Sequence, residues 1–155
     1  MLVIRRQPSG SKPGTDWEAR FNCNRQPEVK VLDKAFAGIP AGARMLVVTP
    51  SVVDAAVAEI PFGAVVEAAI LRRSLAASLD AEYAIPVTTG IALRVVAERA
   101  YLRMQAGADS VTPFWRAIDS PTFEGSRGWI LTTRDRLQQY LKDCHRCADL
   151  AKRFC

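Results

Sequence analysis

The chain has 155 residues, of which 49% are hydrophobic and 24% charged, which is enough apolar material for the core of one ordinary domain. This composition excludes a disordered or fibrous chain, and no apolar run reaches the roughly 18 residues that a membrane span needs. The net charge is +5, with +3 in residues 1–34 (seven basic, four acidic), −1 in residues 35–133 (eight basic, nine acidic) and +3 in residues 134–155 (six basic, three acidic). Basic ends suit nucleic acid or another anionic surface, and they equally promote solubility.

The beginning of the chain is predicted to be a loose arm followed by two strands. Proline and glycine interrupt a polar segment between residues 5 and 24, so residues 1–27 are interpreted as an N-terminal arm. Its apolar start is too short and precedes the arginines, which is not the order of a secretory signal, so we expect a cytoplasmic location. Residues 27–32 alternate like a short strand, and Met45–Val48 form a second strand that ends before Pro50.

Two helices are predicted next from hydrophobic spacing. Ser51 can cap the first helix through its hydroxyl, and the Pro61-Phe62-Gly63 turn stops it. The second helix is predicted over residues 66–79, with Arg72 and Arg73 facing outward. The inward residues predicted for it are Ala69, Ile70, Leu75 and Leu79.

A longer third helix is predicted from about Thr88 to Gly107, after a connection over residues 80–86. Thr88 or Thr89 would cap it, and Gly107 would stop it. Residues 111–118 are β-branched and aromatic, and they are predicted to form a strand.

The remaining pattern indicates a loop over residues 120–128, a return strand over 129–131 and a last helix over 134–152. Three helices followed by a strand, a glycine-bearing loop and a strand are the outline of a winged helix-turn-helix. The expected fold is therefore α/β, mainly α: a winged-helix domain over residues 28–131 with short flanking strands, and an extra C-terminal helix over 132–155.

Several segments resemble a known family. IPFGAVV (60–66) resembles the I-P-x-G-x-V opening of the DNA-binding domain of methylguanine-DNA methyltransferases (alkyltransferases), and TPFWRAI (112–118) stands where that family has its P-C-H-R-V motif. MLVVTP (45–50), IPVTTGI (85–91) and TPFWR are even more similar to a bacterial group of uncharacterised, methyltransferase-like proteins. The resemblance covers residues 28–118 and implies a DNA-binding domain with a role in DNA repair.

The chain departs from the family at the reactive position. Aligned on Pro113 and Arg116, Phe114 takes the place of the acceptor cysteine and Trp115 that of the activating histidine. Neither ring is a nucleophile or a proton shuttle, so we expect no alkyl transfer and no catalytic residue here. Alkyltransferase-like proteins, which carry tryptophan in place of the cysteine, recognise altered bases without repairing them. Pro113, Phe114, Trp115 and Arg116 are accordingly interpreted as a base pocket, or alternatively as plain core.

The third helix supplies the other candidate DNA contacts. The family inserts an arginine from this helix to extrude the base, and Arg94 is the best candidate for that role. Alternatively, Arg94 could pair with Glu98, four positions later on the helix. Arg99 and Arg103 share a face that could touch phosphates. Thr88 and Thr89 could donate hydroxyls to a phosphate at the helix N-terminus, or act only as caps.

Cys144 and Cys147 form a C-x-x-C around the chain's single histidine. On a helix these cysteines share a face, but His145 points about a quarter turn away, which disfavours a zinc site. Ordinary helix cysteines are expected, with a redox pair or a reactive thiol as alternatives, and no metal or cofactor is predicted.

The predicted function is DNA binding, with recognition of a modified or flipped base. The sequence favours a binding protein over an enzyme. The alternative is a protein-interaction module, for another protein or a second copy, that inherited the fold but not DNA binding. The neutral middle of the chain and the extra C-terminal helix favour this alternative. No membrane partner is expected.

Overall fold

The computed structural model describes residues 15–117, which form helices around a small three-stranded sheet. This part of the chain is mixed α/β, as the sequence predicts. In it no helix is long and apolar enough to cross a membrane. The predicted loop, return strand and last helix, together with Cys144 and Cys147, lie outside the described residues.

Both predicted strands are confirmed as a hairpin. Strand β1 (Glu28–Val31) pairs antiparallel with β2 (Arg44–Val47), with Val29 opposite Leu46. A third strand, β3 (Tyr83–Ala84), pairs parallel with β2 on its other side, so the sheet order is β1-β2-β3. Strand β3 lies inside the predicted connection over residues 80–86, where a two-residue strand is too short to leave a hydrophobic pattern.

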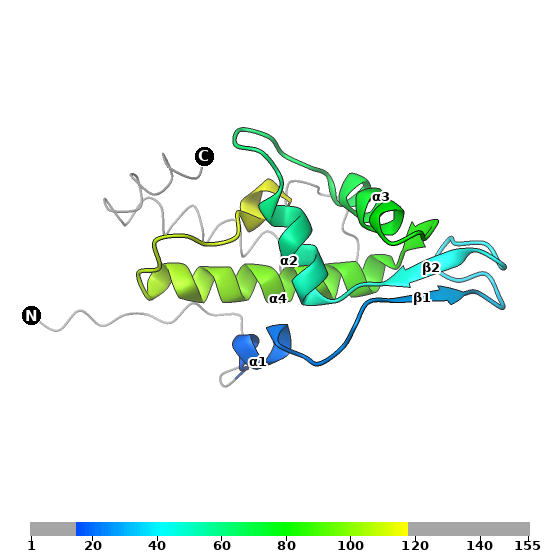
Figure 1. Cartoon of the computed structure of the whole chain (residues 1–155), viewed down its shortest axis with the longest axis horizontal. Helices are drawn as coiled ribbons and strands as arrows, with labels where there is room; N and C mark the ends of the chain where they lie inside the picture. The colour runs from blue at the N-terminus through cyan, green and yellow to red at the C-terminus, as the bar shows by residue number, and fades with distance from the viewer. Residues whose placement is uncertain (1–14, 118–155) are drawn as a thin grey trace, which may run out of the picture.

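The three predicted helices are also present, and the longest is the axis of the molecule. They are α2 (Pro50–Ala58), α3 (Ala68–Ser78) and α4 (Pro86–Gln105). Figure 1 shows α4 running along the molecule, with the hairpin extending from one end and α2 and α3 on the opposite side from a short helix, α1 (Trp17–Phe21). Helix α4 contacts α1, α2 and the short turn at Phe114–Arg116 that follows it in the chain, so it holds these three elements in place.

The predicted helix caps are wrong in the same way at two helices. Helices α2 and α4 begin at Pro50 and Pro86, where a proline is tolerated because its missing N–H lies in the unbonded first turn. Ser51 is therefore inside α2, and Thr88 and Thr89 are inside α4. Both threonine hydroxyls donate to the Ile85 carbonyl, at 3.3 and 2.7 Å, instead of capping the helix. The stop at Gly107 is confirmed, with a positive φ of 86°.

The main core lies between α2, α3, α4 and the sheet. Leu46, Val53 and Leu75 are at most 2% exposed there, and Leu75 was a predicted inward residue. Ile70 was predicted to face inward, but it is 52% exposed, because the buried face of α3 runs through Leu71 and Leu75 instead. Ala69 and Leu79 are only partly buried.

Part of the predicted loose arm is a docked helix. Helix α1 (Trp17–Phe21) packs on α4, and Trp17 is only 6% exposed. The Asp16 carboxylate caps it by accepting a hydrogen bond from the Ala19 N–H at 2.9 Å. The breaker residues that suggested an arm end at Gly14, before this cap, so the prediction was wrong for the segment that follows.

The predicted strand over residues 111–118 is wrong in its described part, which ends at Ala117. A 3-10 turn, η1 (Phe114–Arg116), occupies its centre. The Arg116 N–H donates to the Pro113 carbonyl at 3.0 Å, and the Ala117 N–H donates to that of Phe114 at 3.1 Å. Pro113 has no N–H to give to a sheet ladder, which opposes a strand here.

Candidate functional site

The segments 60–66 and 112–117 lie far apart in sequence but are joined in the structure. The Arg116 guanidinium donates through Nη1 to the Ile60 carbonyl at 2.7 Å. The Val66 N–H donates to the Arg116 carbonyl, also at 2.7 Å. These two bonds hold η1 against the loop that follows α2, and Phe62 and Arg116 from this junction line a cleft.

The cleft lies between α2, the C-terminal half of α4 and the segment that leads into η1, and its volume is about 540 Å³. Arg99 and Arg103 reach it from α4, one helical turn apart, and Arg116 reaches it from η1. Phe62 from the turn after α2 also lines it. The cleft thus combines three guanidinium groups with one aromatic ring.

Four residues that the sequence singled out meet at this cleft: Arg99, Arg103, Pro113 and Arg116. Phe114 does not, because its ring is 1% exposed and belongs to the main core. Trp115 packs partly buried against that core, edge-on to Phe114 with ring centroids 5.3 Å apart. Of the two interpretations of the aromatic pair, the core interpretation is the one that fits Phe114.

Three other predicted contacts lie away from the cleft. Thr88 and Thr89 stand at least ten residues before Arg99 on α4, or about 15 Å along the helix axis. Thr89 is fully buried, and its hydroxyl already serves the Ile85 carbonyl, so it offers no donor to a phosphate. Arg94 lies over the Trp17 ring at 5.4 Å and 4.0 Å from the Glu98 carboxylate, the alternative pairing that its spacing allowed.

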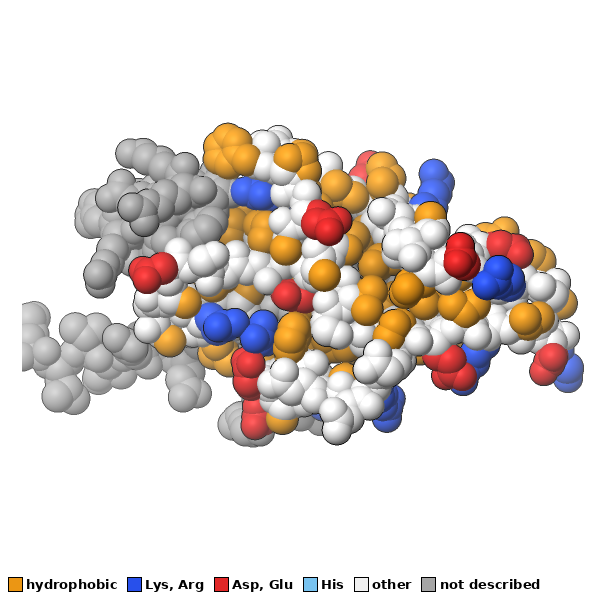
Figure 2. Space-filling model, viewed as in Figure 1, with side chains coloured by type: hydrophobic (Ala, Val, Ile, Leu, Met, Phe, Trp, Pro, Cys, Tyr) orange, Lys and Arg blue, Asp and Glu red, His pale blue; other side chains and the backbone are white. Residues whose placement is uncertain are grey.

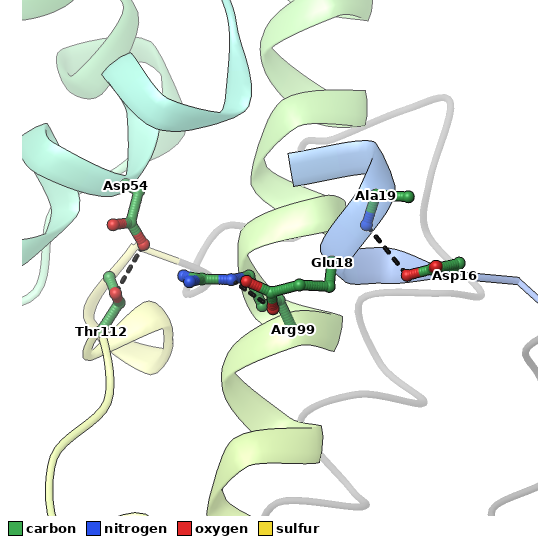
Figure 3. Close-up of polar contacts among 6 residues, drawn as sticks. All are labelled: Asp16, Glu18, Ala19, Asp54, Arg99 and Thr112. Atoms are coloured by element: carbon green, nitrogen blue, oxygen red, sulfur yellow. Dashed lines mark hydrogen bonds and ion pairs between the residues drawn. The ribbon is translucent and has the colours of Figure 1, made fainter. Parts of the chain in front are cut away.

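Arg99 is held in place by α1. Its Nε donates to Glu18 Oε2 at 2.8 Å, and its guanidinium lies 3.9 Å from the centre of the Phe21 ring. Figure 3 shows Arg99 between Glu18 and the Asp54–Thr112 pair. In Figure 2 basic side chains lie directly beside acidic ones where α1 meets α4, so this face is not uniformly positive.

The hydrogen bond from Arg99 holds the pKa of Glu18 below its ordinary value of 4.5, and the charge of Arg103 acts in the same direction. A carboxyl with a lowered pKa in the folded state stabilises that state above its unfolded pKa, and the contribution is lost as pH falls through the folded value. The Glu18–Arg99 contact is therefore expected to hold α1 on α4 at neutral pH and to fail in acid.

Replacing Glu18 by glutamine tests this contact. Glu18 is 55% exposed, so solvent screening limits the expected loss of stability at pH 7 to below about 1 kcal/mol. Thermal unfolding of the variant and the wild type should differ at pH 7 and converge as the pH falls well below 4.5. An equal difference at both pH values would show that the Glu18 charge does not hold α1.

Asp54 and Thr112 close one side of the cleft. The Thr112 hydroxyl donates to Asp54 Oδ1 at 2.5 Å and so ties α2 to the segment before η1. The carboxylate accepts this bond at the cleft wall, where it also lowers the local positive charge. The guanidinium groups remain in excess over this single carboxylate among the lining residues.

Phe62, which is 66% exposed, was not predicted as a site residue. Its ring lies 5.9 Å from the Arg116 guanidinium. The sequence contained a signal for its exposure, because a phenylalanine between Pro61 and Gly63 stands in a turn and is not on the buried face of a helix.

Residues 15–117 contain no group of three or more metal-binding side chains. Cys23 is an exposed free thiol. No protein-family model, characterised protein or solved structure matches this chain.

Proposed function

We propose that the protein binds DNA at the cleft and accommodates there a modified or flipped base without transferring an alkyl group from it. The observation that carries the proposal is the meeting of Arg99, Arg103 and Arg116 with the exposed Phe62 ring. Guanidinium groups pair with phosphate oxygens, and an aromatic ring offers a stacking surface to any base.

The division of roles follows from the contacts. Arg103 is exposed, and its guanidinium is the group best placed to reach a phosphate. Arg116 is fixed by its bond to the Ile60 carbonyl and stands beside Phe62, which suits it to border a base. A cleft of about 540 Å³ is in the usual range for a site that takes a small organic group.

We also propose a fold subclass and a location for the protein. The helices α2, α3 and α4 would be the helical part of a winged-helix domain, with the wing in residues beyond 117, and the protein would act in the cytoplasm. The winged-helix part is supported by the hydrogen bonds that join the two segments that resemble the alkyltransferase domain, 60–66 and 112–117. Phe114 is a buried hydrocarbon ring, so the position aligned with the acceptor cysteine offers no nucleophile.

The test is fluorescence anisotropy with two matched duplexes, one plain and one carrying an alkylated guanine, at several salt concentrations. We expect salt-dependent binding to both and tighter binding to the alkylated duplex. The Arg103→Gln variant should bind both more weakly, with the slope of log K against log salt shallower by about 0.9.

The matched control is Arg73→Gln, which removes the same charge from an exposed position on α3 outside the cleft. It should leave both affinities unchanged. An equal loss in the two variants would mean that only net charge matters, and no binding to either duplex would remove DNA as the ligand.

One observation favours the alternative of a protein-interaction module. Val87 and Ile91 are one turn apart near the start of α4, and they are 60% and 56% exposed. Exposed apolar side chains at helical spacing suit the groove of another protein. Failure to bind any duplex at low salt would make this the leading function.

A further inference from the structure

Strand β1 is an edge strand whose outer side is exposed. Within residues 15–117 the sheet runs β1-β2-β3, so β2 is the only strand that pairs with β1. All four residues of β1 are exposed, and Val31 reaches 64%. An exposed edge of this kind presents unpaired backbone groups to another strand.

The hydrogen bonds of the hairpin show which backbone groups face outward. The Leu32 N–H donates to the Ala43 carbonyl at 3.0 Å, so the backbone of Leu32 faces the segment that leads into β2 of the same molecule. Because backbone groups alternate in direction along a strand, Lys30 and Glu28 also face β2. The N–H and C=O groups of Val29 and Val31 therefore point to the open edge.

We propose that β1 is a homodimer interface, where it pairs antiparallel with β1 of a second copy, Val29 opposite Val29. The N–H and C=O of Val29 then bond those of Val29 in the second copy, and the Val31 N–H donates to the Pro27 carbonyl of the second copy. Pro27 has no N–H, so the ladder ends there. The pairing joins the two sheets into one.

Charge complementarity selects this register. It places Glu28 opposite Lys30 of the second copy, twice by symmetry, in the non-hydrogen-bonded positions where side chains approach most closely. Two other registers pair outward-facing groups. Val29 opposite Val31 would bring Lys30 against Lys30 of the second copy, and Val31 opposite Val31 would leave Glu28 and Lys30 without a partner in β1. Like charges directly opposite destabilise a strand pair. Figure 2 shows both signs of charge on the hairpin.

Sedimentation equilibrium under reducing conditions tests the proposal with charge-swapped chains. The wild type should have twice the 17.0 kDa of the single chain. Glu28→Lys sets lysine against Lys30, and Lys30→Glu sets glutamate against Glu28, so each variant alone should be monomeric. An equimolar mixture of the two should recover the dimer mass, because each pair then has opposite charges. A monomeric wild type, or a mixture that stays monomeric, overturns the proposal.

A second variant tests the backbone pairing without the charges. Val29→Pro removes an N–H that faces the open edge and leaves the β1–β2 ladder intact, so it should give a monomer with an unchanged far-ultraviolet circular dichroism spectrum. The control Lys34→Glu changes an exposed charge just outside β1 and should remain dimeric. A dimer that survives both Glu28→Lys and Val29→Pro would be assembled through another surface, and the inference would be wrong.

Discussion

Replacing Phe114 by alanine is expected to lower the free energy of unfolding by about 3–5 kcal/mol. The ring is 1% exposed in the main core, and truncating it removes its burial and leaves a cavity. Such a loss is a large part of the stability of an ordinary domain. Denaturant unfolding followed by circular dichroism measures it.

The same variant separates the two interpretations of the aromatic pair. If Phe114 only supports the fold, DNA binding should be lost only to the extent that the variant unfolds. A variant that kept wild-type stability and lost only the preference for alkylated DNA would return Phe114 to the base pocket.

Replacing Phe62 by alanine is expected to have the opposite pattern. The ring is 66% exposed, so the free energy of unfolding should change by no more than about 0.5 kcal/mol. Base stacking on an aromatic ring contributes about 1–3 kcal/mol, so affinity for the alkylated duplex should fall roughly 5- to 150-fold in the anisotropy assay.

Phe36→Ala is the matched control for Phe62. Phe36 is 52% exposed near the tip of the hairpin and does not line the cleft. It should leave affinity for both duplexes unchanged. An equal loss in the two variants would mean that exposed rings contribute unspecifically, and an unaffected Phe62 variant would exclude stacking at the cleft.

The elements with a sustained hydrophobic pattern could be predicted, and so could the end of α4 at Gly107, but the caps at the helix starts could not. The apolar spacing of α2, α3 and α4 identified three helices, but side-chain caps were expected where prolines start two of them. Strand β3 has only two residues, and η1 depends on hydrogen bonds that start at Pro113. Neither feature leaves a periodic signal in the sequence.

The candidate site could be predicted only in part, because its contacts are long-range. Arg99 and Arg103 were identified from their shared helix face, and both reach the cleft. The partner of Arg99 is Glu18, 81 positions earlier in the chain, in a segment predicted to be a loose arm. No local pattern could indicate that a carboxylate from this segment would lie on the arginine face of α4.

The parallel pairing of β2 with β3 constrains the order in which the chain can fold. Leu46 pairs with Ala84, so the pair closes a loop that contains all of α2 and α3. Closing such a loop costs chain entropy before its two-residue ladder gives anything back. The β1–β2 hairpin joins segments that are close in sequence, whereas β3 meets β2 only once the chain that carries α2 and α3 has folded back. We therefore expect the β2–β3 pairing to form after the hairpin.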